Sequence, residues 1–214
     1  MFAKIVKWFL KTSILEACLK AIGKFQLKVA GDKPTFPMAD YHLILDDVLI
    51  DEYCTIYTFA TADVSNIVST AIRKLTDGDF NHTGLIVFND EGLPMAFHVT
   101  TDGLVVQDFL EVLRDTDYLC INKLELQPDD FEKAHGRIDF LYSIIDKIKY
   151  DYSLTLGYDD DYFYCSEATY FVLDGLYRDI DLAPQMIYGI SVFPPNQMTK
   201  LGEIIYTNHP LIEA

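Results

Sequence analysis

Apolar positions recur along the chain with two different spacings, which predict a mixture of helices and short strands. The helical spacing covers 64–75. It returns after Pro128, where aspartates follow the proline at the positive end of the expected helix dipole and the apolar face continues to Ile148. A third helix is predicted over 166–177. Short apolar runs bounded by turn residues predict strands over 46–50, 53–59, 83–88, 94–100, 104–107, 118–124, 189–192 and 203–207.

Two turn signals lie between predicted strands. Residues 89–92, Asn-Asp-Glu-Gly, are expected to close the strand 83–88. Asp102-Gly103 is typical of a type I′ turn, which would join 94–100 to 104–107 in a hairpin. The strands occur in groups between helices, without the regular strand–helix alternation of a parallel sheet. The pattern therefore predicts an α+β fold.

The first 30 residues differ from the rest of the chain. They carry six lysines and one acidic residue, and apolar residues such as Ile5 and Trp8 fall between the lysines with helical spacing. We therefore expect a basic amphipathic helical segment over 1–30, followed by one folded domain over 31–214. Two interpretations of the segment stay open. It is either a helix docked on the acidic domain, or a helix through which residues 1–28 bind a membrane surface or a protein partner.

Charge and composition narrow the class of protein. The formal net charge of −16 repels phosphate backbones, so nucleic acid is not an expected partner. Lysines interrupt the N-terminal apolar stretch, which argues against a signal peptide, and no apolar run reaches the length of a transmembrane helix. The four cysteines have neither disulfide-scaffold nor metal-ligand spacing, so we expect a reducing compartment. The expected location is the cytoplasm or a larger assembly.

Two short segments hold residues suited to catalysis. His82 stands at the start of a predicted buried strand, in Asn81-His82-Thr83-Gly84, and Cys165 stands where an aromatic extended stretch becomes a helix, in Tyr164-Cys165-Ser166-Glu167. Free amides and the dipole at a helix N-terminus lower the pKa of a thiol, and a histidine can take its proton. Each residue alone is more often structural, as a packed cysteine or a satisfied core histidine.

The order of these motifs resembles the circularly permuted branch of the NlpC/P60 papain-like superfamily, the YiiX/YaeF-like proteins. Asp47-Val48-Leu49 is similar to an early strand of that family, and Tyr150-Asp151-Tyr152 and 193–196 match it in kind and order. The resemblance covers about 43–207. It implies a permuted papain-like domain, with an antiparallel sheet packed against helices, preceded by the extra N-terminal amphipathic helix.

The resemblance also implies a catalytic site, with Cys165 as the nucleophile and His82 as the general base. The third, orienting residue of the family stands on the following strand, often as glutamate, and His98 holds that position here. A histidine stabilises an imidazolium less than a carboxylate does, so the expected thiolate–imidazolium pair is weaker. Glu167 is interpreted first as an acid that stabilises the first helical turn. The candidates for substrate or oxyanion contacts are Tyr164, Ser166, Glu167 and Tyr150.

By this resemblance we expect a cysteine hydrolase that cleaves an amide or ester through an acyl-enzyme, without a metal or an organic cofactor. The implied substrates are peptide or acyl compounds, including cell-wall peptides and lipid amides. A second hypothesis stays open: a weakly active or inactive binding module of the same fold, attached to a larger assembly by its N-terminal helix. The rate of thiol alkylation at different pH values distinguishes the two hypotheses.

Overall fold

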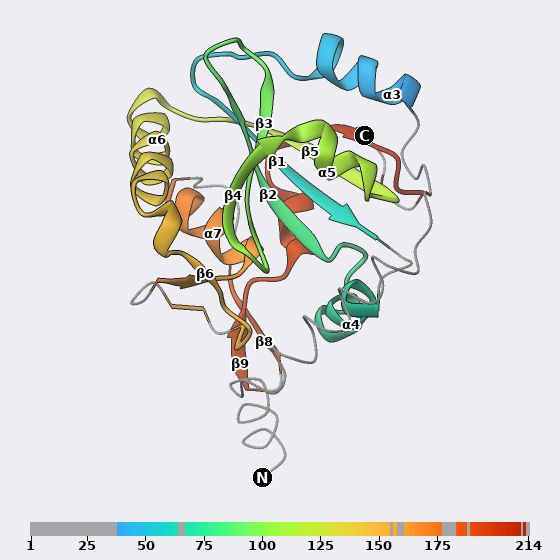
Figure 1. Cartoon of the computed structure of the whole chain (residues 1–214), viewed down its shortest axis with the longest axis vertical. Helices are drawn as coiled ribbons and strands as arrows, with labels where there is room; N and C mark the ends of the chain where they lie inside the picture. The colour runs from blue at the N-terminus through green and yellow to red at the C-terminus, as the bar shows by residue number, and fades with distance from the viewer. Residues whose placement is uncertain are drawn as a thin grey trace.

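The computed structural model describes residues 38–63, 67–154, 156–157, 161–176, 183–187, 189–210 and 212 (Figure 1). The basic segment 1–30 lies outside these residues, so its predicted helix and the domain boundary at residue 31 stay predictions. Within the described part of the chain, no helix is long and apolar enough to cross a membrane.

An antiparallel sheet of six strands forms the centre of the molecule, in the order β10-β5-β1-β2-β3-β4. The strands are β1 (Thr55–Ala62), β2 (His82–Phe88), β3 (Pro94–Thr100), β4 (Gly103–Asp108), β5 (Tyr118–Glu125) and β10 (Glu203–Thr207). Two small pairs accompany them: β6 (Lys149–Tyr150) with β7 (Tyr162–Phe163), and β8 (Gln185–Ile187) with β9 (Ile190–Val192). The predicted α+β fold with an antiparallel sheet is confirmed.

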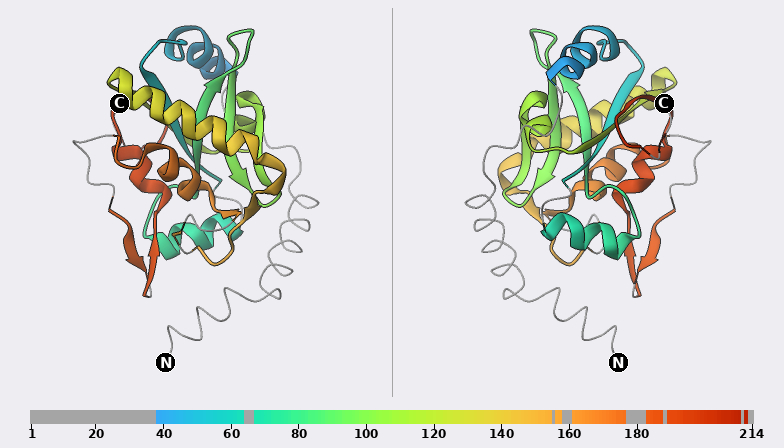
Figure 2. Two further views of the ribbon diagram at one scale, coloured as in Figure 1. Left: turned by 90° about the vertical axis from the view of Figure 1, so that its left-hand side faces the viewer. Right: turned by 90° about the vertical axis from the view of Figure 1, so that its right-hand side faces the viewer.

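Helices cover both faces of this sheet, with α6 and α7 against one face and α5 against the other (Figures 1 and 2). The α-helices are α3 (Met38–Leu43), α4 (Ile67–Thr76), α5 (Phe109–Arg114), α6 (Pro128–Ser143) and α7 (Cys165–Leu173), and the short turns are η1 (Ile44–Val48), η2 (Ile145–Lys147) and η3 (Pro195–Lys200). The predicted helices correspond to α4, α6 and α7. The hydrophobic pattern does not predict α5.

Alternation along the strands gives the sheet two separate cores. Leu85 and Phe97 belong to the core that α6 and α7 complete. Ile86 and Ala96, their neighbours along β2 and β3, belong to the second core, where they pack with Phe109 of α5. Since successive side chains of a strand point to opposite faces, these residues also fix the face on which each remaining side chain of β2 and β3 lies.

The strand predicted over 46–50 is wrong, and with it the similarity of Asp47-Val48-Leu49 to an early family strand. These residues lie in and directly after η1, a π-helical turn in which the N–H of Leu49 donates to the carbonyl of Ile44 (2.9 Å). The wide turn buries the side chains of Ile44 and Leu49 in the same core, at 0% and 5% exposure. A short apolar run fits a buried strand and a buried helical turn equally well, so periodicity alone does not separate them.

The two predicted turns have different outcomes. Asn89 accepts hydrogen bonds from the N–H groups of Glu91 and Leu93 and so closes β2, as predicted. The turn between β3 and β4 is not type I′, because only Gly103 has a positive φ (107°) while the residues before it do not. Gly103 pairs with Thr100, and from this pair the register of β3 with β4 continues without interruption.

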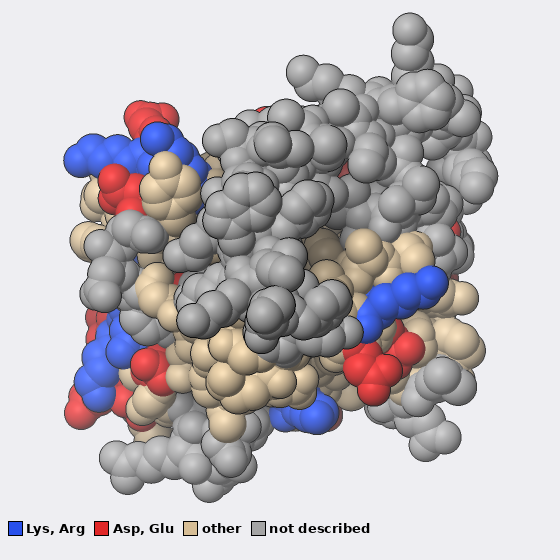
Figure 3. Space-filling view, turned by 90° about the horizontal axis from the view of Figure 1, so that it is seen from below, with Lys and Arg blue, Asp and Glu red and all other residues tan. Residues whose placement is uncertain are grey.

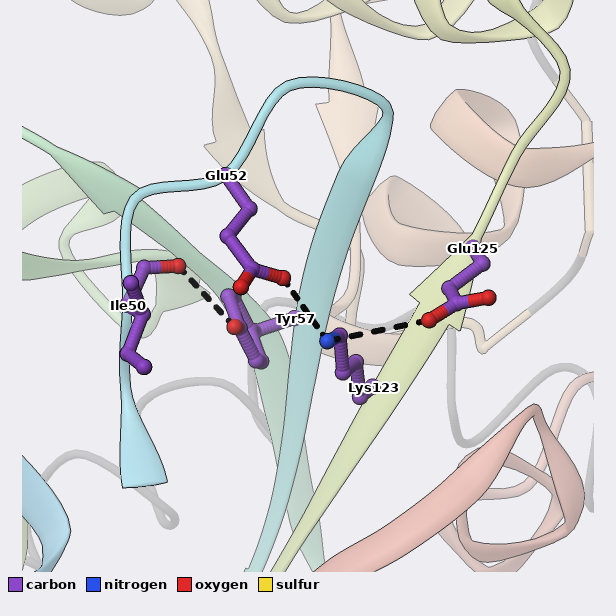
Figure 4. A network of polar contacts seen from close by, with 5 residues as sticks. All are labelled: Ile50, Glu52, Tyr57, Lys123 and Glu125. Carbon is purple, nitrogen blue, oxygen red and sulfur yellow. Dashed lines mark hydrogen bonds and ion pairs between the residues drawn. The ribbon is translucent and has the colours of Figure 1, made fainter. Parts of the chain in front are cut away.

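A polar network lies on β1 and β5 at the end of β1 that is far from His82 (Figure 4). Lys123 Nζ lies 2.8 Å from Glu52 Oε2 and 3.7 Å from Glu125 Oε1. Beside it, the hydroxyl of Tyr57 donates to the carbonyl of Ile50 (2.9 Å). These contacts attach the segment before β1 to the sheet.

Candidate active site at the start of β2

Hydrogen bonds fix the chain where it enters β2. The N–H of Phe80 donates to Asn196 Oδ1 in η3 (2.8 Å), and the N–H of Asn81 donates to a carbonyl of β1 (3.0 Å). The side-chain oxygen of Asn81 in turn accepts from the N–H of Asp63 (3.1 Å). His82, the next residue, therefore starts from a backbone that is held by two other elements.

The strands β2 and β3 are not paired along their whole length. The ladder between β1 and β2 extends to His82, whereas the ladder between β2 and β3 begins at Leu85 and Phe97. We call residues 82–84 of β2 with 98–100 of β3 the open end. A Cβ atom on Gly84 would lie 2.7 Å from His98 Cβ, so only glycine leaves room for the side chains gathered there.

The open end brings His82 and His98 together. His82 Nε2 and His98 Nδ1 lie 2.6 Å apart, the separation of a hydrogen bond between the rings. By strand alternation, His82 shares the face of Ile86 and His98 that of Ala96, which is the face covered by α5. Both rings also lie against Phe59 on this face, with centroids 6.1 and 5.9 Å from its ring.

Both imidazoles are neutral at neutral pH. Burial lowers the pKa of His98, which is 4% exposed, to about 4. Burial, and then the charge of His98, lower the pKa of His82 well below its usual value. Two neutral rings have one hydrogen each, so they occupy one of two coupled states.

In the first state, His82 Nε2–H donates to His98 Nδ1; His82 Nδ1 is then bare and His98 Nε2 carries a hydrogen. In the second state, His98 Nδ1–H donates, His82 Nδ1 carries the hydrogen and His98 Nε2 is bare. In each state, one of the two nitrogens outside the shared hydrogen bond, His82 Nδ1 and His98 Nε2, carries a hydrogen and the other is bare. Only the first state gives His82 a basic nitrogen on its outer side.

Cys165 opens α7 and lies on the other side of the sheet. Its side chain is 4% exposed. Burial raises the pKa of the thiol above its usual value, although hydrogen bonds from the backbone of Thr83, from the Ser166 hydroxyl (3.9 Å) and from the amides of Ser166 and Cys165 all oppose this shift. The thiol is therefore protonated at neutral pH, with backbone amides directed at its sulfur.

The thiol and the imidazole pair reach the open end from opposite faces of the sheet. Thr83, whose backbone hydrogen-bonds to Cys165 Sγ, directly follows His82, so the sulfur lies beside the backbone of the candidate base. Among the residues that the structure describes, no hydrogen bond joins this sulfur to His82 or His98. The ring of His82 therefore contacts the ring of His98, and the sulfur of Cys165 contacts the backbone of Thr83.

Glu167 stabilises the start of α7. Its carboxylate is fully buried, and its two oxygens accept from the N–H groups of Gly157 (2.7 Å) and Tyr164 (3.3 Å). A carboxylate that accepts amide hydrogens at a helix N-terminus caps the helix and holds the preceding loop against it. These contacts agree with the interpretation of Glu167 as an acid that stabilises the first turn.

The two tyrosine candidates have different surroundings. The hydroxyl of Tyr164 accepts from the N–H of Phe193 (2.8 Å), so it is engaged by the backbone of the core. Burial raises the pKa of Tyr150 well above its usual value, and the charge of a Cys165 thiolate adds to this shift. The charge of a Cys165 thiolate acts on the pKa of Tyr164 in the same direction, so the two tyrosines differ in that the Tyr164 hydroxyl is already engaged by the Phe193 amide.

A polar pocket of about 200 Å³ lies on the α5 face beside the imidazole pair. His82 and His98 line it, and Cys165 does not. The other polar side chains around it come from the end of β1 and the residue after it, the residue before β2, β4, α5 and the turn after α5, and they are Thr61, Asp63, Asn81, Gln107, Glu111, Asp115 and Thr116.

The hydrophobic pattern gives no reason to place these pocket residues in a site, because α5 has only six residues and too few turns for its period to stand out. The available signal is Asp108, whose side chain accepts from the N–H of Leu110 (2.9 Å) and caps the helix. Among the described residues, no group of three or more His, Cys, Asp or Glu side chains is arranged to hold a metal ion.

No protein-family model and no curated protein matches the chain. The fold is similar to that of a crystal structure described as metalloprotein yiiX from Escherichia coli O157:H7, DUF1105. The TM-score is 0.52 and the sequence identity is 18%, and the match covers 75% of this chain and 98% of that chain. At this identity the similarity is evidence for the fold alone.

Proposed function

We propose that the chain is a thiol hydrolase that cleaves an amide or ester bond of a peptide or acyl substrate. Cys165 is the nucleophile, His82 the general base, and His98 the positioning residue that orients His82. One observation carries the proposal: a thiol at a helix N-terminus and a hydrogen-bonded pair of imidazoles lie on the two faces of β2 at its open end. The similarity of the fold to the yiiX structure supports a permuted papain-like, NlpC/P60 type of domain.

The first step forms a thioester. In the state where His82 Nε2–H donates to His98, the thiol proton passes to His82 Nδ1 while the sulfur attacks the substrate carbonyl carbon. The carbonyl electron pair moves to the oxygen, and the amides of Cys165 and Ser166, which already point at the sulfur, stabilise this oxyanion. The intermediate collapses, and His82 returns the proton to the departing amine or alcohol.

The second step releases the acyl group. Water attacks the thioester carbon, His82 takes a proton from this water, and the sulfur leaves and is protonated again, which yields a carboxylic acid and the free thiol. Throughout, His98 Nδ1 accepts from His82 Nε2–H and so stabilises the imidazolium. It does this less well than a carboxylate, so we expect slower acylation than in an enzyme with an acidic third residue.

The test is acetylation of the folded protein by 4-nitrophenyl acetate, with the modified residue located by mass spectrometry of peptides. We expect an acetyl group on Cys165 in the wild type and none in Cys165→Ala. Cys120→Ala is the matched control, since the Cys120 thiol is fully buried, donates to Asn122 Oδ1 (3.4 Å), and has its pKa raised by burial to about 12. This variant should be acetylated as fast as the wild type.

A second candidate function is a binding module without turnover. It is favoured by the burial of Cys165, which is 4% exposed, and by the raised pKa of its thiol. If this function is correct, Cys165 is acetylated only after unfolding, at the rate of a free thiol in a peptide. Attachment to a partner or a membrane surface through residues 1–28 stays a prediction under either function.

A further inference from the structure

A buried hydroxyl, rather than the charged surface, connects the two halves of the proposed site. On the described part of the face in Figure 3, basic side chains lie beside acidic ones, so no uniform charge there attracts an ion. The hydroxyl belongs to Thr83, which stands in β2 between His82 and Gly84 and is fully buried. It therefore lies at the open end, beside the candidate base.

The Thr83 hydroxyl makes a bond between two strands. Its Oγ1 donates to the carbonyl of Phe59 on β1 at 2.5 Å, and Phe59 is also fully buried. At this point β2 is paired with β1 but not with β3, because the ladder between β2 and β3 begins only at Leu85. The position of β2 at the open end therefore depends on its contacts with β1, and the hydroxyl adds a side-chain bond to them.

This bond joins the two faces of the sheet. By strand alternation, the Thr83 side chain shares the face of Leu85, which is the α7 face. There the backbone of Thr83 hydrogen-bonds to Cys165 Sγ. The ring of Phe59 lies on the α5 face, where it packs against Phe109 and against both imidazoles. The hydroxyl thus holds, from the thiol side, the backbone of the residue that supports the imidazole pair on the other side.

Packing around the Phe59 ring leaves it little room to shift. A Cβ atom on Gly84 would lie 2.7 Å from two atoms of this ring and 2.7 Å from His98 Cβ. The two imidazoles are in turn fixed to each other, since His82 Nε2 and His98 Nδ1 lie 2.6 Å apart. In an interior packed this closely, the position of the Phe59 backbone determines where the imidazole pair lies.

We propose that Thr83 is a positioning residue for the thiol and for the base together, a role that rests on the proposed function. Its hydroxyl holds β2 at the separation from β1 that places His82 against the Phe59 ring and the Thr83 backbone against the sulfur. The hydroxyl takes no part in the bond changes of the reaction. It acts by keeping the two reacting groups, on opposite faces of one strand, in a fixed relative position.

The test compares Thr83→Val with Thr83→Ser in the acetylation of Cys165 by 4-nitrophenyl acetate. Valine keeps the branched shape of threonine but lacks the hydroxyl, whereas serine keeps the hydroxyl. We expect acetylation to fall at least about tenfold in Thr83→Val and to stay within about threefold of the wild-type rate in Thr83→Ser. If Thr83→Val does not fold, Thr83→Ala, which also lacks the hydroxyl, takes its place. A wild-type rate in the variant without the hydroxyl overturns the positioning role.

The matched control is Thr207→Val on β10, which β5 and β1 separate from β2. The Thr207 hydroxyl makes the same kind of bond, to the carbonyl of Leu119 on β5 (3.0 Å), and it also accepts from the N–H of His209 (3.1 Å). This variant loses at least as many hydrogen bonds as Thr83→Val, yet Cys165 should be acetylated at the wild-type rate. Equal slowing in the two variants overturns the positioning role, because lost stability alone then explains it.

A second measurement does not depend on the thiol. The hydrogen between His82 Nε2 and His98 Nδ1 lies in a short hydrogen bond, so it should give a proton NMR signal far downfield in the full chain labelled with ¹⁵N in histidine. We expect this signal to shift or broaden in Thr83→Val and to be unchanged in Thr83→Ser and Thr207→Val. An unchanged signal in Thr83→Val overturns the hold of Thr83 on the imidazole pair. An absence of acetylation at Cys165 in the wild type overturns the proposed function, and the NMR signal then still decides whether Thr83 positions the pair.

Discussion

The two faces of the sheet differ sharply where they meet the open end of β2. On the α7 face, Cys165 is closed off from solvent, and backbone amides and the Ser166 hydroxyl surround its sulfur. On the α5 face, His82 and His98 line a pocket with acidic walls. Burial nevertheless favours the neutral form on both faces. It raises the pKa of the thiol and lowers the pKa of both imidazoles.

The thiol and the two imidazoles are therefore all neutral in the free protein. A thiolate–imidazolium pair, as the resemblance implies, requires a thiol pKa below that of the imidazole, and burial moves the two pKa values apart. Proton transfer in the proposed reaction therefore accompanies the attack on the substrate.

Acidification tests the imidazole side and has the largest expected effect on stability. The pKa of His98 is about 4 in the folded chain, below the usual value of 6.5, so the unfolded chain binds the proton first as the pH falls. The stabilisation is complete above pH 6.5 and is lost as the pH falls towards 4. Between pH 7 and pH 4.5 the loss from His98 alone is about 2.5 kcal/mol, measured as the difference in the free energy of unfolding in urea at the two pH values.

The variant His98→Gln should show a smaller loss of stability on acidification than the wild type. His135→Gln, on the exposed surface of α6, is the control and should lose as much as the wild type. An equal loss in all three proteins would contradict the assignment of His98 as a buried neutral base.

The contact between β2 and β3 is tested by Gly84→Ala. The new Cβ atom would lie 2.7 Å from His98 Cβ and 2.7 Å from the ring of Phe59, so one of them must move. We expect a loss of about 2 kcal/mol in the free energy of unfolding. Gly136→Ala in α6, where a Cβ meets nothing within 4 Å, should instead stabilise by about 0.5–1 kcal/mol. Similar values for the two variants would refute the tight packing at Gly84.

On the thiol side, Tyr164→Phe separates structure from catalysis. The change leaves the N–H of Phe193 without the hydroxyl that accepts from it, so unfolding should become easier by about 1 kcal/mol. Acetylation of Cys165 should stay within threefold of the wild-type rate. A hundredfold slower reaction in a folded variant would return Tyr164 to the oxyanion site.

The smallest effect is expected far from the open end, at the ion pair of Lys123 with Glu52 (Figure 4). Glu52→Gln should lower the free energy of unfolding by less than about 1 kcal/mol, with little remaining effect in high salt, because the Glu52 side chain is 44% exposed. Acetylation of Cys165 should not change. A slower reaction would show that the two ends of the sheet are coupled.

Much of the fold follows from local patterns in the sequence. Short apolar runs bounded by turn residues predict β2 and β3, and Pro128 with its following acids predicts α6, because these signals depend only on neighbouring residues. The strand predicted over 46–50 is wrong because neighbouring residues alone do not decide the structure there. The turn depends on burial of Ile44 and Leu49, and so on the residues that pack against them. The short helix α5 also depends on tertiary packing, through Phe109 and Leu113.

The candidate site divides in a similar way. The resemblance of the motifs implies His82, His98 and Cys165, and the two histidines do lie together. The face from which each side chain approaches depends on the pairing of β1 with β2, where Thr61 opposes His82, and no local pattern reports that register. The acidic pocket needs β1, β4 and α5 to come together, so its carboxylates look like ordinary surface acids in the sequence.

The most direct test of the account is the rate of acetylation of Cys165 by 4-nitrophenyl acetate at pH 7 in the wild type and in His82→Gln, with folding verified by urea unfolding of both. If His82 takes the thiol proton, the variant should react about 10²–10⁴ times more slowly. Equal rates in the two folded proteins would contradict the pairing of His82 with Cys165.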